Sequence, residues 1–198
     1  MKKFKYLTTI LILILVLTGC KNKEEKTLTD ATKNTSITEK GLTSYRAKVS
    51  ISGKDINEKY IVLNKNNKNY TISLDDNKQI YINITKGKKV ITDEEGKDYS
   101  KEIKYDYTNT DIFLEALNTN DSTIKTKDIK IGNKEYIEYD FNVSKETFNK
   151  IMKNFNIEVS NDGNGFAYVD KNSHVFLINY TVDSININVT YTRLNGIK

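Results

Sequence analysis

The feature that most constrains this chain is the alternation of apolar and polar residues, with a period of two, in many short segments. In residues 137–143 every odd position is apolar and every even position is polar. Successive side chains of a strand point to opposite sides of a sheet, so the pattern predicts strands with one buried and one wet face. Short turn sequences between the segments favour antiparallel hairpins. The expected strands are residues 45–51, 56–63, 70–74, 80–84, 89–92, 123–131, 137–143, 166–170, 174–182 and 185–194.

Two stretches depart from this alternation. Apolar residues within 112–117 recur at helical spacing, after the candidate N-caps Asn109, Thr110 and Asp111. Ser144 is placed to cap a second helix, whose apolar residues fall at i, i+3, i+4 and i+7. That apolar stripe consists of Phe148, Ile151, Met152 and Phe155. We therefore expect short amphipathic helices on one side of the sheet.

Together these elements predict an α+β domain with about ten antiparallel strands. A sheet that is apolar on one face must curl and be covered. Two short helices are too small to cover the whole apolar face. The residues alone leave two architectures open, a closed barrel or a half-barrel with an apolar hollow.

The first twenty residues have the layout of an export signal. Lysines near the N-terminus precede an apolar run over residues 7–17. A membrane-spanning helix needs about 20 apolar residues, so this shorter run predicts a cleavable signal. It closes with Leu17-Thr18-Gly19-Cys20, which resembles the lipobox of bacterial lipoproteins. The resemblance implies that residues 1–19 are removed and that Cys20 becomes the lipidated first residue of the mature chain.

The lipobox resemblance also implies what the anchor is. Diacylglycerol would be attached to the Cys20 thiol, with an N-acyl group such as palmitate as an option, and no other cofactor is expected. Cys20 is the only cysteine, which excludes an intramolecular disulfide and a thiolate metal cluster. Abundant Lys, Asn and Ile are typical of an AT-rich genome and, with the lipobox, indicate a low-GC Gram-positive bacterium. The expected location is the outer face of the plasma membrane.

Residues 20–40 are almost entirely polar, so they are predicted to form the lipidated cysteine and a flexible tether. A short helix within residues 28–44 is the alternative. Residues 41–198 then form one β-rich domain, which is long enough to bury a core.

The charge of the mature chain narrows the choice of partners. Three of the five net positive charges belong to Lys2, Lys3 and Lys5 of the signal, which leaves a mature chain close to +2. That is too little to indicate a nucleic-acid partner. The expected partners are the membrane, through the lipid anchor, a lipid ligand and a protein at the membrane surface.

The residues offer little catalytic chemistry. His174 is the only histidine, and it starts a predicted strand just past a turn, where we expect exposure to solvent. A Cys/His pair is excluded, and a Ser-His-Asp triad would have to use His174. The sequence Asp162-Gly163-Asn164-Gly165 is similar to part of a calcium loop. It lacks the spacing and terminal glutamate of an EF-hand, so a hairpin turn is predicted instead. We expect no catalytic residue, no metal site and no enzymatic activity.

The order of the elements resembles the lipoproteins with a LolA-like half-barrel, in particular the LppX/LprA/LprF/LprG group. The resemblance runs from about residue 42 to residue 193. It is carried by Leu42-Thr43-Ser44-Tyr45-Arg46, the central helix after Tyr105-Asp106-Tyr107, Ile131-Gly132-Asn133-Lys134-Glu135-Tyr136, and Ala167-Tyr168-Val169-Asp170-Lys171-Asn172. The chain departs from the group in its weak N-terminal helix, its lack of tryptophan and its shorter helical middle.

This resemblance implies a curled antiparallel sheet with two or three short helices over its concave face. It also implies a cavity that binds the acyl chains of a lipid or glycolipid. The candidate cavity residues are Ile137, Tyr139, Phe141, Phe148, Ile151, Met152, Phe155, Phe176, Ile178, Tyr180, Ile187 and Val189. The alternative is a cell-surface interaction or sensing module, whose sheet is a filled scaffold and whose Lys/Asn-rich loops bind a protein or a wall polymer.

Overall fold

The computed structural model describes residues 23–36, 43–53, 55–66, 68–117, 125–192 and 195. The predicted signal and Cys20 lie outside the described residues. The strands are β1 (Ser44–Gly53), β2 (Ile56–Lys65), β3 (Asn69–Leu74), β4 (Gln79–Thr85), β5 (Lys88–Thr92), β6 (Lys125–Ile131), β7 (Lys134–Val143), β8 (Gly163–Asp170), β9 (Val175–Val182) and β10 (Ile185–Thr192). The helical segments are α2 (Lys23–Thr35), the 3₁₀ helix η1 (Asp111–Leu117), α3 (Lys145–Met152) and the 3₁₀ turn η2 (Lys153–Phe155).

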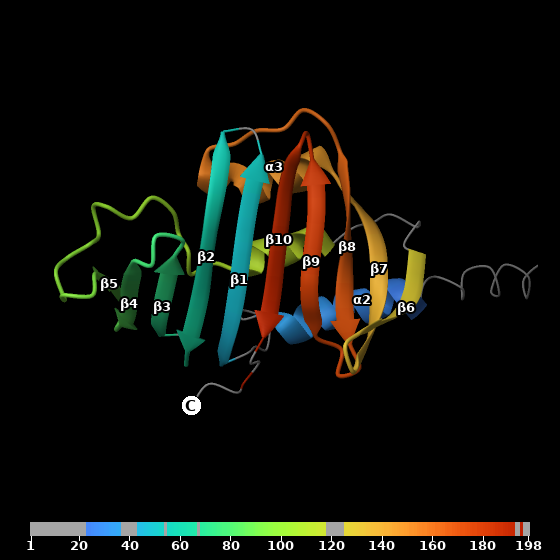
Figure 1. Ribbon diagram of the computed structural model, residues 1–198, viewed down its shortest axis with the longest axis horizontal. Coiled ribbons are helices and arrows are strands. Elements are labelled where there is room, and N and C mark those ends of the chain that lie inside the picture. The colour runs from blue at the N-terminus through green and yellow to red at the C-terminus, as the bar shows by residue number, and fades with distance from the viewer. Residues whose placement is uncertain are drawn as a thin grey trace, which may run out of the picture.

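All ten strands belong to one antiparallel sheet, in the order β5-β4-β3-β2-β1-β10-β9-β8-β7-β6 (Figure 1). Strands β1–β5 and strands β6–β10 each form a meander of sequence neighbours. Pairing of β1 with β10 joins the two meanders. The edges are β5 and β6, so the sheet formed by the described strands is open. The predicted α+β half-barrel is confirmed, and the closed barrel is excluded.

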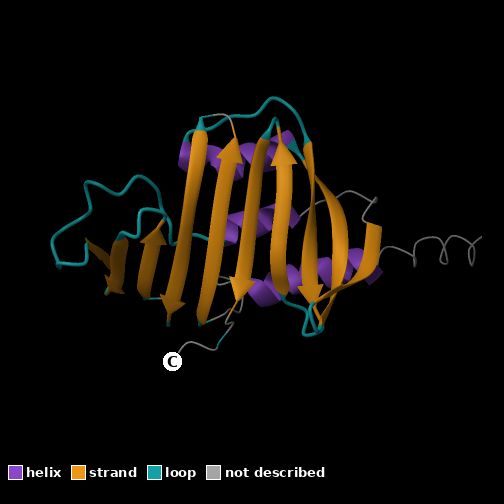
Figure 2. Ribbon diagram, in the orientation of Figure 1, coloured by secondary structure: helices purple, strands orange, loops and turns teal. Residues whose placement is uncertain are grey.

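The helices lie across one face of the sheet, which we call the inner face (Figure 2). Along β10 buried and half-buried residues alternate, as the period-two pattern predicts. The register places the buried residues of neighbouring strands opposite one another. One row across the inner face contains Tyr139, Ala167, Ile178, Val189 and Val49. The core of the protein is the space between these rows and the helices.

Helix α2 occupies most of the segment predicted to be a flexible tether, and that prediction is wrong there. Leu28 and Ala31 are buried in the core. The hydroxyl of Thr35 accepts a hydrogen bond of 2.7 Å from the backbone N–H of Val175, at the start of β9. Two apolar residues on one side of a polar helix are too few for a visible 3.6-residue period. The contacts with the sheet, which are distant in sequence, fix this helix.

The two predicted central helices are present. The first is η1, a 3₁₀ helix, and most of its residues are buried. Ser144 caps α3 as predicted, and its hydroxyl oxygen accepts a hydrogen bond of 3.2 Å from the N–H of Thr147. The predicted stripe continues through η2, where Phe155 is buried.

Strand β8 begins earlier than the sequence predicts. Gly163 and Gly165, expected in a hairpin turn, pair with Val143 and Phe141 in the sheet. A Cβ atom on Gly165 would lie 2.5 Å from Cβ of Tyr180 and would also collide with the carbonyl oxygen of Asn179. Strand β9 therefore passes too close for a side chain, and glycine permits this approach.

Replacing Gly165→Ala should lower the free energy of unfolding by about 1–3 kcal/mol, because the backbone of β9 must shift to make room. Asn164→Ala is the matched control, since Asn164 is exposed in the same strand. Urea unfolding of both variants checks this expectation. Equal stability of the two variants would contradict the close approach.

Candidate functional site

The predicted apolar stripe of the helices faces the inner side of the sheet. Phe148, Ile151 and Met152 of α3 have 0 % of their surface exposed. Phe148 packs edge-on against Tyr180 of β9, with ring centroids 5.9 Å apart. The predicted strand residues that lie on the inner face are Ile137, Tyr139, Phe141, Ile178, Tyr180, Ile187 and Val189. Their contact with a ligand stays a prediction.

Phe176 is the exception, and the prediction that it faces the helical stripe is wrong. The register between β8 and β9 shifts by one residue, so that Val169 pairs with Val175 and Tyr168 pairs with Leu177. This bulge turns Phe176 to the other face, where it stacks on Tyr136 with ring centroids 4.9 Å apart. Val175 takes the buried inner position. Alternation within β9 alone cannot reveal a bulge, because it depends on the neighbouring strand.

The inner face is filled in this conformation. Ile178, Tyr180 and Ile187 have 0 % exposure, like the α3 residues above them. A side chain with no exposed surface borders no space large enough for water. Acyl chains could therefore enter only if the helices move away from the sheet.

Two tyrosine hydroxyls at the centre of the site are satisfied by the segment that leads into η1. The hydroxyl of Thr110 donates to Tyr45 Oη at 3.0 Å, and Tyr191 Oη donates to the carbonyl oxygen of Thr110 at 2.9 Å. Thr110 has 0 % exposure. Burial raises the pKa of both tyrosines. The sequence predicts Thr110 only as a candidate helix cap. Its hydrogen bonds to tyrosines of β1 and β10 join segments that are distant in the chain, so local spacing does not predict them.

Tyr180 differs from these two tyrosines. Its hydroxyl is buried, and it has no hydrogen-bond partner among the described residues. Burial raises its pKa as well. A buried polar group without a partner is rare in folded proteins and costs free energy. Among the described residues, this hydroxyl is the buried side-chain polar group for which the structure shows no partner.

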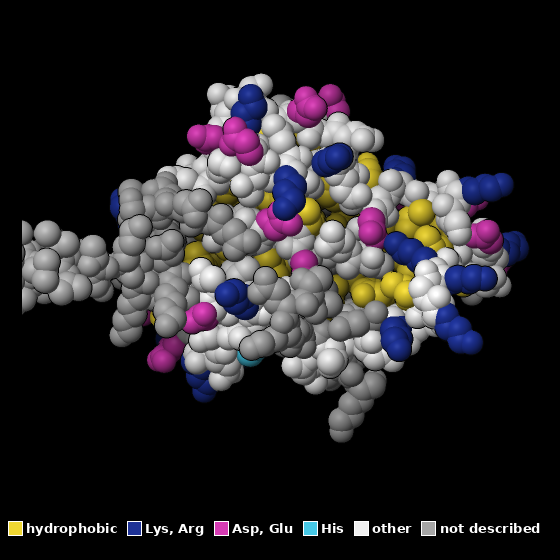
Figure 3. All heavy atoms as spheres, turned by 180° about the vertical axis from the view of Figure 1, so that it is seen from behind, with side chains coloured by type: hydrophobic (Ala, Val, Ile, Leu, Met, Phe, Trp, Pro, Cys, Tyr) yellow, Lys and Arg dark blue, Asp and Glu magenta, His cyan; other side chains and the backbone are white. Residues whose placement is uncertain are grey.

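The helical layer is made of separate pieces that are joined by a few polar contacts. Lys150 of α3 forms an ion pair of 2.6 Å with Glu115 of η1. Ser36, just after α2, donates a hydrogen bond of 2.9 Å to Asp111. Apolar side chains show at the surface between these pieces, and they also show toward the β5 end of the sheet (Figure 3). Short segments of this kind can separate from the sheet more easily than one continuous layer.

The outer face, on the other side of the sheet, carries four aromatic rings in a row. Neighbouring ring centroids are 4.9–6.4 Å apart. The row consists of Phe166, Tyr168, Tyr136 and Phe176. Phe166 lines a groove of about 530 Å³ with Asp140, Asn142, Asn164, Asn179 and Thr181. Tyr136 and Phe176 line a second groove of about 650 Å³ at the rim, with Asp170 and His174.

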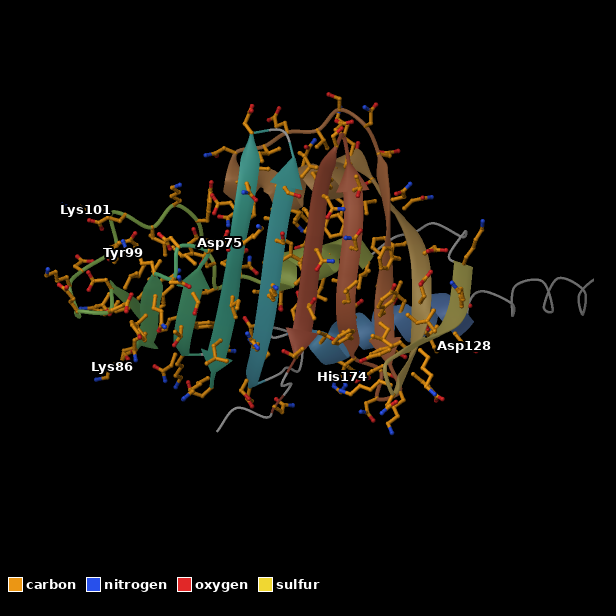
Figure 4. All side chains as sticks on the ribbon, in the orientation of Figure 1. Asp75, Lys86, Tyr99, Lys101, Asp128 and His174 are labelled. Carbon is orange, nitrogen blue, oxygen red and sulfur yellow. The ribbon has the colours of Figure 1, made fainter. Side chains whose placement is uncertain are left out.

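Titratable side chains do not converge into a catalytic or metal site in the part of the chain that the structure describes. No group of three or more His, Asp or Glu side chains there could hold a metal ion. His174 is half-buried at the lower rim (Figure 4), with Nδ1 3.7 Å from Asp170. Asp75 follows β3 and Asp128 lies in the edge strand β6, so these two carboxylates are far apart across the sheet (Figure 4). Within the same ranges, no helix is both long and apolar enough to cross a membrane.

Comparison with solved structures identifies the fold. Lipoprotein LppX of Mycobacterium tuberculosis aligns over 89 % of this chain and 98 % of its own, with a TM-score of 0.51 and 9 % identity. LprF of Mycobacterium bovis aligns over 88 % and 93 %, with a TM-score of 0.55 and 11 % identity. The chain has the fold of LppX and LprF. The predicted resemblance is therefore confirmed for the fold.

Other comparisons add little. A LolA-superfamily protein of Nitrosomonas europaea aligns over 85 % of this chain and 90 % of its own at 10 % identity, with a TM-score of 0.29. No protein-family profile and no curated protein matches the sequence.

The buried tyrosines make the stability of the protein sensitive to high pH. Burial raises the pKa of Tyr45, Tyr60, Tyr180 and Tyr191 above the ordinary value of 10.0. A raised pKa in the folded state gives stability that is complete below the unfolded-state pKa and is lost as the pH rises. The free energy of unfolding should therefore fall steeply above about pH 10. Urea unfolding at stepped pH measures this, and Tyr60→Phe should make the decline less steep. An unchanged urea midpoint at about pH 11 would contradict it.

Proposed function

We propose that this protein is a membrane-anchored, extracytoplasmic lipoprotein that binds the acyl chains of a lipid or glycolipid and has no enzymatic activity. The chains would lie between the inner face of the half-barrel and its helices. The observation that carries the proposal is a continuous apolar inner face, from β2 to β7, covered by separate helical pieces. Such a face can exchange its contacts with the helices for contacts with hydrocarbon at little cost, because both are apolar.

The placement of the helices supports this proposal. Helix α3 packs on Tyr180 through Phe148, and Ile151 and Met152 of the same helix are also buried. Its ion pair with η1 is largely exposed on the Lys150 side, and such a pair adds less than about 1 kcal/mol. This exposed ion pair is therefore a weak link between α3 and η1.

The anchor belongs to the same proposal. Cys20, in the lipobox-like sequence, would carry diacylglycerol and hold the domain on the outer face of the plasma membrane. Two acyl chains give stable membrane attachment, whereas one chain binds only weakly and reversibly. LppX, which has the same fold, is described as a lipoprotein.

Lipid binding can be tested on the mature chain carrying Cys20→Ser, which cannot be acylated. We expect the purified protein to contain about one non-covalent lipid per chain, since the hydrophobic face retains it. Native mass spectrometry and analysis of organic extracts measure the lipid. The matched control is wild-type protein, which should stay in the membrane fraction while Cys20→Ser leaves it. Absence of any bound lipid, also after incubation with lipid vesicles, would count against the proposal.

The outer face favours a second candidate function, binding of a wall polysaccharide. Aromatic rings offer flat apolar surfaces to sugar rings, and the amides beside them offer donors and acceptors for hydroxyl groups. Asn179, Asn186 and Thr181 already form a connected hydrogen-bond network next to the groove at Phe166. The groove also contains one lysine and one aspartate, Lys125 and Asp140, whose charges balance, so it suits a hydroxyl-rich polymer of low net charge.

Co-sedimentation with purified peptidoglycan tests this second candidate. Tyr168→Ala should lower the bound fraction, because it interrupts the aromatic row. Tyr81→Ala is the control, since Tyr81 is an exposed tyrosine on another strand of the outer face. Equal binding by both variants would exclude the aromatic row as a glycan surface.

A further inference from the structure

The starting point is a contrast among buried tyrosines of the inner face. Tyr45 and Tyr191 both hydrogen-bond to Thr110. Tyr180 is equally buried, yet its hydroxyl has no partner in the described part of the chain. Phenylalanine would fill the same space without leaving a polar atom unsatisfied. The hydroxyl of Tyr180 therefore destabilises the conformation that the structure shows, in which the helices close over the sheet. A hydrogen bond formed in another state of the protein would account for a tyrosine at this position.

The surroundings of Tyr180 indicate a state in which its hydroxyl could find a partner. The residue lies on β9, opposite Ile187 of β10 and Gly165 of β8. Its ring meets the edge of Phe148, at an interplanar angle of 88°. The cover above it is α3, which the Lys150–Glu115 ion pair links to η1. Movement of α3 away from the sheet would uncover Tyr180 in the middle of an apolar surface.

We infer that the Tyr180 hydroxyl is a hydrogen-bond donor for the carbonyl group of an ester- or amide-linked acyl lipid bound on the inner face. The inference rests on the proposed function and adds the chemical class of the ligand. An acyl ester carries a carbonyl oxygen directly next to its hydrocarbon chains. When such chains replace α3 on the sheet, the carbonyl oxygen can accept the hydrogen bond that the closed conformation lacks.

A single buried hydroxyl is enough to discriminate between lipids that differ in their hydrogen-bond acceptors. In an apolar site, a ligand that leaves a buried polar group unpaired is rejected more strongly than one that lacks a methylene group. A dialkyl ether lipid lacks the projecting carbonyl oxygen and offers only an ether oxygen, which is flanked by two alkyl groups and would hydrogen-bond to Tyr180 less well. The inner face should therefore prefer acyl lipids over ether lipids with the same chains and headgroup.

The test compares two probes, a short-chain diacyl phosphatidylglycerol and its dialkyl ether analogue, on the mature chain carrying Cys20→Ser. The binding constants are measured by titration calorimetry. We expect the diacyl lipid to bind about tenfold more tightly than the ether lipid. Tyr180→Phe should remove this preference by weakening the binding of the diacyl lipid alone.

Stability provides a second, independent readout. Without lipid, Tyr180→Phe should unfold at the same or a higher temperature than the parent chain, because it removes an unsatisfied hydroxyl. The matched control is Tyr45→Phe, which takes away the partner of the Thr110 hydroxyl. That variant should unfold at a lower temperature and keep the preference for the diacyl lipid.

The outcomes separate this inference from the proposed function. Binding of both lipids with equal affinity by the parent chain overturns the inference and leaves lipid binding in place. The same holds if Tyr180→Phe keeps the preference. Failure of the parent chain to bind either lipid overturns both.

Discussion

Pairing of β1 with β10 is the interaction on which the rest of the structure depends. It joins the first strand to the last, with Ala47 opposite Tyr191 and Ile51 opposite Ile187. Every other strand contact links neighbours in sequence. Without this pairing the two meanders would be separate sheets, each with an exposed apolar face too large to stay in water. The same two central strands supply Tyr45 and Tyr191, whose bonds to Thr110 fix the chain where it crosses from β5 toward β6.

The polar groups of the core divide the helical layer into a fixed part and a part that can move. The segment before η1 is held by two buried hydrogen bonds to Tyr45 and Tyr191, which are costly to break because the groups would lose their partners. Phe148 of α3 packs on Tyr180 of β9, whose hydroxyl has no partner among the described residues. Replacement of α3 by hydrocarbon would therefore break no buried hydrogen bond at Tyr180 and could form one. The buried hydrogen bonds thus hold the segment before η1 to the sheet, whereas the hydrogen bonds of Lys145 and Asn149 in α3 lead to the segment before β8.

The sequence predicts those parts of this fold that local spacing determines. The period-two pattern of residues 137–143 and the cap at Ser144 depend on neighbours in the chain, and the structure confirms both. The errors arise where a distant segment decides. Phe176 turns outward because of a bulge against β8, and Gly165 belongs to a strand because β9 passes close to it. The apolar alternation predicts most strand residues of the proposed site. It does not predict the different surroundings of Tyr180 and Tyr191, because these depend on which helical segment lies above each tyrosine.

Helix α2 also changes how the proposed anchor would hold the domain. A flexible tether of about 20 residues would let the domain move some 25 Å from the membrane. Because α2 begins at Lys23 and is bonded through Thr35 to the start of β9, only three peptide units separate Cys20 from a packed element. Three extended residues span at most about 11 Å. If Cys20 carries the lipid, the side of the sheet that bears the helices is therefore held close to the bilayer. The helical cover would then lie on the same side of the sheet as the point of attachment, and the aromatic row would lie on the opposite face.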